Sequence, residues 1–183
     1  MILMFRRTEL ISLLLLAAAA SALTGCGAKQ DSARVEFEMG DRVTVGPLTY
    51  NVVETVWRSQ LGADFKIRIP QERFLLITVS VTNGGGKEVS VPLLSLENQN
   101  GKIYQESDNG ESVDNWFGIL RTLTPAQTQQ GRLLFDVPLT SYRLRITDGG
   151  EPGNDKASFI RIPLRMDGDP GLDNAPTVST PVK

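Results

Sequence analysis

The chain has 183 residues, with 19 basic and 21 acidic side chains, one cysteine and no histidine. A single cysteine excludes an internal disulfide, and the lack of histidine removes the commonest general base and the commonest metal ligand. The nearly balanced charge gives no electrostatic reason to bind nucleic acid, and it would not draw the chain onto anionic lipid except through an anchor.

Residues 1–25 have the order of an export signal. Arg6 and Arg7 precede an apolar stretch at 10–23 that only Ser12 and Ser21 interrupt. The stretch has about 14 residues, fewer than the roughly 20 that a membrane-spanning helix needs. We therefore predict a removable leader. The two arginines also fit twin-arginine export, so the export route stays open.

The leader ends in Leu23-Thr24-Gly25-Cys26. This segment resembles a lipobox, which implies cleavage before Cys26 and a diacylglyceryl group on its sulfur. Two or more acyl chains hold a soluble domain stably on a bilayer, at about 0.8 kcal/mol per buried methylene. The alternative is an ordinary secretory signal followed by a chance cysteine.

The segments on either side of the central part are polar. Residues 26–34 are small and polar, which predicts a flexible tether. Residues 166–183 contain Pro170, Pro176 and Pro181 among Asp, Gly and Thr, which predicts a disordered tail. A single folded domain is expected over residues 35–165.

Residues 75–82 alternate with the period of a β-strand. Leu75, Ile77, Val79 and Val81 form an apolar face, and Leu76, Thr78, Ser80 and Thr82 form a mostly polar one. Further short runs are expected as strands at 43–45, 50–57, 89–91, 93–96, 102–105, 131–137, 142–146 and 159–162. Many short strands between turn signals predict an all-β, antiparallel sandwich. A short turn at 113–120 is the one candidate for helix.

Several of these segments carry a family resemblance. They are residues 40–46, 50–57, 73–83, 131–138 and 142–146. The chain resembles the widespread bacterial lipoprotein domain of unknown function that has a telokin-like, immunoglobulin-like β-sandwich. The resemblance covers roughly residues 38–148 and implies a fold and an envelope location, but no reaction and no catalytic residues. Residues 159–164 lie beyond it and are expected to add a final edge strand.

The sequence offers little chemistry. Ser-His catalysis is excluded without histidine, so we predict no catalytic residue, no cofactor and no metal site. The acidic groups Asp108, Glu111, Asp114 and Asp167, Asp169, Asp173 are interpreted as solvated turns, although calcium binding stays open. Glu54, Glu72, Glu97 and Glu106 are interpreted as strand-surface charges.

Three aromatic residues are candidates for recognition. Trp57, at a strand end, is expected in the core. Trp116 and Phe117 follow a turn-rich stretch, and either core packing or a contact surface fits them.

The leading hypothesis is a non-enzymatic, lipid-anchored binding or adaptor module. It would face away from the cytoplasm in the cell envelope, on an outer or a plasma membrane. Its partners would be the membrane, through lipid on Cys26, and an envelope protein or glycan, but not nucleic acid. The alternatives are an envelope enzyme or hydrolase inhibitor, and a structural spacer.

Overall fold

The computed structural model describes residues 36–63, 65–150 and 155–165. The leader, Cys26, the tether and the tail therefore lie outside the described residues. Within them every regular element is a strand, so the predicted helical turn at 113–120 is wrong. The backbone is left-handed at Ser112, Asn115 and Gly118, and these residues interrupt any helical run.

One sheet is antiparallel throughout, with the order β2-β3-β4-β9. Its strands are β2 (Arg42–Val45), β3 (Leu48–Arg58), β4 (Phe74–Asn83) and β9 (Thr128–Asp136). The β3–β4 pairing shifts register at Val52/Glu54, where the sequence inserts one extra residue as a β-bulge.

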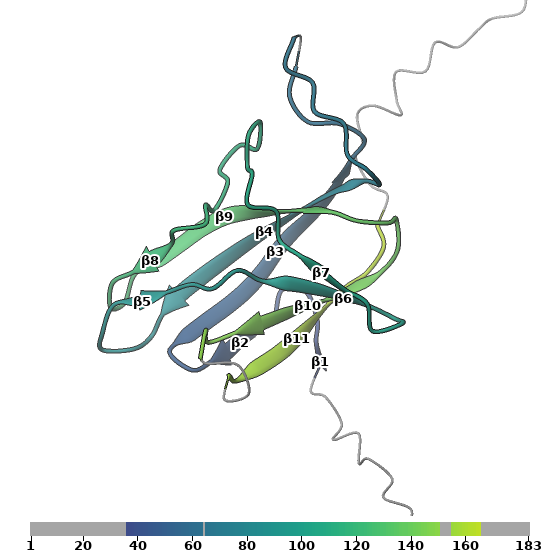
Figure 1. Cartoon of the computed structure of the whole chain (residues 1–183). Coiled ribbons are helices and arrows are strands. Elements are labelled where there is room, and N and C mark those ends of the chain that lie inside the picture. The colour runs from purple at the N-terminus through teal and green to yellow at the C-terminus, as the bar shows by residue number, and fades with distance from the viewer. Residues whose placement is uncertain (1–35, 64, 151–154, 166–183) are drawn as a thin grey trace, which may run out of the picture. The chain divides into compact units, whose positions relative to one another are not determined.

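The second sheet has the order β1-β11-β10-β6-β7. Its strands are β1 (Glu36–Phe37), β11 (Ala157–Ile162), β10 (Tyr142–Thr147), β6 (Ser95–Asn98) and β7 (Ile103–Gln105). A small pair, β5 (Val89–Ser90) with β8 (Thr122–Leu123), lies beside the two sheets. Figure 1 shows the two large sheets face to face, as the predicted sandwich requires.

The second sheet departs from the prediction in two ways. The strand at 157–162 forms as expected, but it is not an edge strand, because β1 pairs with its outer side. That pairing is parallel, whereas the other pairings of the sheet are antiparallel. Neither β1 nor β8 was predicted, since two-residue strands show no periodicity.

The main core confirms the predicted register of β4. Leu75, Ile77, Val79 and Val81 are each at most 1% exposed and pack with the inward residues of the opposite sheet. Tyr142 closes one corner of this core, because its hydroxyl donates to the carbonyl of Pro138 at 2.6 Å. A tyrosine that bonds back a few residues upstream is characteristic of immunoglobulin-like sandwiches.

The other face of β4 is polar only in part. Phe74 and Leu76 are buried there in a second cluster with Leu61, Val113 and Leu134. Two of these five residues belong to loops, so loops cover that end of the sheet.

Candidate interaction surface

Two long connections lie side by side over the second cluster. They are the β3–β4 connection (59–73) and the β7–β8 connection (106–121), which rise near one another in Figure 1. Arg68 Nη1 donates to the carbonyl of Asn109 at 2.7 Å and joins the two loops. Loops that a rigid sandwich holds together are where such folds usually carry binding residues.

The β7–β8 connection begins and ends with a buried ion pair. The carboxylate of Glu106 accepts hydrogen bonds from Arg121 Nη2 at 2.6 Å and Nη1 at 3.1 Å, and both side chains are 0% exposed. The prediction of Glu106 as a surface charge is therefore wrong. Tyr104 lies two residues earlier, on the same face of an extended strand, and it also packs against the core. This alternation was the signal in the sequence that could have placed Glu106 inward.

Backbone groups of the neighbouring segment supply further hydrogen bonds to Glu106 and Arg121. Leu94 N–H donates to Glu106 Oε2 at 3.1 Å, and Arg121 Nη2 donates to the Pro92 carbonyl at 3.1 Å. Burial raises the pKa of Glu106, and the hydrogen bonds from Arg121 and Leu94 act in the opposite direction. The ion pair thus links both ends of the β7–β8 connection to residues 92–94, and its role is structural.

Phe117 and Trp116 pack against the protein. Phe117 is 4% exposed in the main core, with the Arg121 guanidinium 5.0 Å from its ring centroid. A Cβ on Gly131 would lie 2.4 Å from Phe117 Cδ2, so only glycine admits the ring there. Trp116 is half-buried against the second cluster. Trp57 is 4% exposed in the main core, as predicted.

The same segment covers the outer edge of β9. Phe117 N–H donates to the Arg132 carbonyl at 3.0 Å, and Arg132 N–H donates to the Asn115 carbonyl at 2.8 Å. Farther along the strand, Ser107 N–H donates to the Leu134 carbonyl at 2.8 Å. Open strand edges recruit other strands, so this connection protects β9 from edge-to-edge association.

The β3–β4 connection contains a small hairpin that sequence reasoning missed. Leu61 and Arg68 exchange backbone hydrogen bonds of 2.9 and 2.8 Å, and Leu61 is buried in the second cluster. Phe65 and Ile67 lie in the loop that this bridge closes, and Ile69 directly follows it; the three side chains are 104%, 50% and 68% exposed. The apolar residues at alternate positions 65, 67 and 69 were the signal for this hairpin in the sequence, but the same alternation is typical of an ordinary buried strand face.

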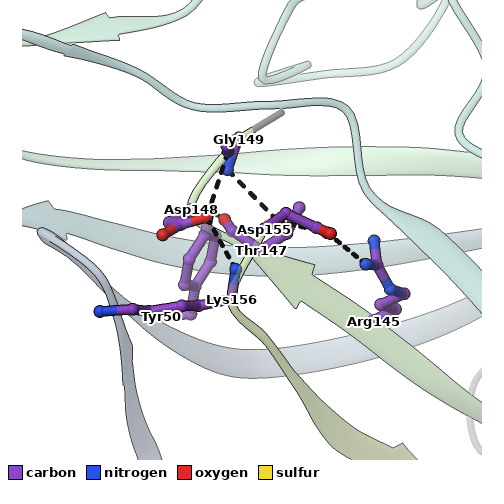
Figure 2. Close-up of polar contacts among 8 residues, drawn as sticks. Tyr50, Arg145, Thr147, Asp148, Gly149, Asp155 and Lys156 are labelled. Carbon is purple, nitrogen blue, oxygen red and sulfur yellow. Dashed lines mark hydrogen bonds and ion pairs between the residues drawn. The ribbon is translucent and has the colours of Figure 1, made fainter. Parts of the chain in front are cut away.

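A polar network lies near the turn between β2 and β3, and Figure 2 shows it. Tyr50 hydroxyl donates to the Thr147 carbonyl at 2.8 Å, and burial raises its pKa. Asp148 Oδ1 accepts from the N–H groups of Gly150 and Lys156, each at 3.1 Å. Asp155 binds Arg145 and Thr147. The chain's own donors thus occupy these carboxylates.

A groove of about 420 Å³ crosses the solvent face of the second sheet. Arg143 lies between two carboxylates there, 3.0 Å from Glu36 and 2.6 Å from Glu97, and Arg161 is 3.2 Å from Glu36. These opposite charges compensate one another, so the groove has no strong preference for an anion or a cation.

The carboxylate of Glu36 makes stability depend on pH. Hydrogen bonds from Arg143, and then Arg161, lower its pKa below 4.5 in the folded protein. Its contribution is therefore complete above about pH 4.5 and is lost as the pH falls through the lowered pKa. We expect Glu36→Gln to be less stable than the wild type at pH 7, by a difference that decreases as the pH falls below about 4.5. Urea unfolding over a series of pH values from 7 downward measures this, and a pH-independent difference would contradict it.

Among the described residues, no helix is long and apolar enough to cross a bilayer. No three of their acidic or cysteine side chains are placed to hold a metal ion together, and Asp108, Glu111 and Asp114 are exposed.

The fold and its loops define a small, all-β protein of the immunoglobulin-like sandwich class. Within that class the chain belongs to the DUF4352 family, a domain of unknown function, whose family model matches residues 37–157. The family expectation drawn from the sequence is thereby confirmed, and the match ends as β11 begins.

Two solved structures from Bacillus subtilis are similar in fold. The yjhA protein is 16% identical, with a TM-score of 0.54, and the alignment covers 69% of this chain and 98% of that one. A "putative lipoprotein (ycdA)" is 17% identical, with a TM-score of 0.53, over 69% of this chain and 39% of that one. A search of curated proteins gave no match. At these identities the likeness establishes the fold.

Proposed function

We propose that this chain is a lipid-anchored, non-enzymatic binding module on the extracytoplasmic side of the cell envelope. The observation that carries the proposal is Cys26 in Leu23-Thr24-Gly25-Cys26, directly after an export-type leader. The family match begins only at residue 37, which leaves a short polar segment as a tether. The fold likeness to ycdA supports the same location.

A binding role is favoured over an enzymatic one by how the buried titratable groups are used. Glu106 is paired with Arg121, Tyr50 bonds to Thr147 and Tyr142 bonds to Pro138. Each of these contacts joins parts of the fold, as expected of a scaffold. The exposed side chains of the hairpin favour a contact surface over a plain spacer.

Cys26→Ser tests the anchor in cells that process lipoproteins. The wild-type chain should enter the detergent phase on phase separation and should carry acyl groups on its N-terminal cysteine by mass spectrometry. The variant should keep its leader or lose its lipid, because the acylated sulfur is absent.

Ser32→Ala, in the tether, is the matched control and should behave as the wild type. Equal processing and partitioning of the Cys26→Ser chain would reject the lipid anchor.

A further inference from the structure

The described chain enters the sandwich at the end opposite the hairpin. β1 runs parallel to β11 with Glu36 beside Phe159, so β1 begins near the start of β11. The start of β11 pairs with the end of β10, where Thr147 lies opposite Ala157. The β2–β3 turn belongs to the same end, because the Tyr50 hydroxyl near the start of β3 donates to the Thr147 carbonyl. β3 runs from this end to the β3–β4 connection, so the hairpin lies at the far end of the domain (Figure 1).

The hairpin and the first part of the β7–β8 connection form one surface. We call it the distal tip, and it consists of residues 61–63, 65–69 and 107–114. Arg68 donates to the Asn109 carbonyl at 2.7 Å and to the Ser107 hydroxyl at 3.5 Å. Farther along the connection, a Cβ on Gly62 would lie 3.1 Å from Ser112 Oγ. The connection therefore follows the hairpin over several residues, and the side chains of both segments can meet the same partner.

The apolar part of the distal tip stands on an ordered support. Its exposed apolar side chains are Phe65, Ile67 and Ile69. Besides the Leu61–Arg68 bridge, Lys66 N–H donates to the Ala63 carbonyl at 3.1 Å and closes the turn. An ordered support lowers the conformational entropy lost on binding, and a partner that covers these side chains removes their apolar surface from water.

The charges of the distal tip indicate which partner fits it. In sequence, residues 61–69 and 107–114 contain four acidic and two basic residues. The acidic side chains that the structure shows to be exposed there are Asp108, Glu111 and Asp114. Of the two bases, Lys66 is exposed and Arg68 is half-buried against neutral groups. This excess of negative charge disfavours an anionic bilayer or a second copy of the same tip, and it favours a basic surface, because like charges repel and opposite charges attract.

We propose that the distal tip is the docking surface for a basic protein of the cell envelope. Phe65, Ile67 and Ile69 enter an apolar pocket of that protein, and the acidic side chains of the connection meet lysine or arginine around the pocket. The inference rests on the proposed function, because lipid on Cys26 would attach the domain through the end at which Glu36 enters and leave the tip accessible. In specific interfaces of this kind the apolar anchors supply affinity, and the charges at the rim guide association.

Site-specific photocrosslinking of the full chain in its native cells tests the proposal. Benzoylphenylalanine replaces Ile67 at the tip or, in the control, Val53 on the solvent face of β3, since the two native side chains are 50% and 52% exposed. Mass spectrometry of the crosslinked peptides identifies the molecule that was reached and the segment of it that was contacted.

A charge reversal tests the chemistry of the partner. Glu111→Lys is added to the chain that carries the crosslinker at position 67. Glu88→Lys is the matched control, because Glu88 is also exposed and follows β4 at the opposite end of the domain, where Gly84 N–H donates to the Pro47 carbonyl. Both reversals lie on the surface, so both variants should unfold at the wild-type temperature.

We expect position 67, but not position 53, to crosslink to one protein, at a segment where apolar residues lie beside lysine or arginine. Glu111→Lys should lower the yield of that adduct several-fold, and Glu88→Lys should leave it unchanged. Equal adducts at both positions, no adduct at 67, or an adduct that Glu111→Lys does not weaken would overturn the proposal. Contact of position 67 with lipid, with a second copy of the chain or with an acidic segment would overturn it as well.

Detergent partitioning of the same cells judges the anchor separately. A chain that stays in the aqueous phase and still forms the adduct at position 67 would reject the lipid anchor alone. A chain that enters the detergent phase and forms no adduct would reject the docking surface alone.

Discussion

Arg121→Ala should lower the free energy of unfolding by about 3–5 kcal/mol, the largest effect that we expect of a single change in this protein. Arg121 and Glu106 are both fully buried, and the guanidinium supplies two of the three hydrogen bonds that the Glu106 carboxylate accepts. Without the guanidinium, the buried Glu106 carboxylate must either stay charged with no counter-ion or take up a proton. Urea unfolding of the full chain at pH 7 measures the loss.

Two further variants separate the buried charge from the fold that surrounds it. Arg121→Met combined with Glu106→Leu removes both charges and should recover much of the stability, because replacing a buried pair with apolar groups is often neutral. Glu54→Gln removes one partner of an exposed pair, Arg132–Glu54 at 3.9 Å, and should cost less than about 1 kcal/mol. A loss for Arg121→Ala no larger than for Glu54→Gln would show that the Glu106 site is open to water.

Ile77→Ala should destabilise the protein by roughly 2–4 kcal/mol. Ile77 is 0% exposed between the two sheets, and its β4 strand is paired on both sides, with β3 and with β9. The loss combines the transfer of the missing methylene and methyl groups with the cavity they leave in a core that cannot fully collapse. Thermal and urea unfolding of the variant measure it.

Ser80→Ala, on the opposite face of the same strand, is the control. Ser80 is half-buried, and its substitution should change stability by no more than about 0.5 kcal/mol. If Ser80→Ala proved the more damaging change, the side chains of β4 would face opposite to the arrangement described here, since a one-residue slip exchanges the two faces.

The sequence by itself was enough to predict the sandwich class, most of the longer strands, and the inward face of β4. These features depend on a local pattern, because the alternation of apolar residues reports which side of a strand is buried. The core position of Trp57 follows from the same pattern. The leader and Cys26 are likewise local signals, although they fall outside the described residues.

Only the tertiary structure decided which distant segments meet. Glu106 and Arg121 look like ordinary surface charges until the β7–β8 connection brings them together beneath residues 92–94. Phe65, Ile67 and Ile69 have the spacing of a buried strand face, yet their hairpin turns them to solvent because Leu61 and Arg68 take the sites against the second cluster and the neighbouring loop. The parallel pairing of β1 with β11 joins residues at opposite ends of the domain. Burial in these places depends on non-local pairing, and no periodicity within a short window of sequence reports that.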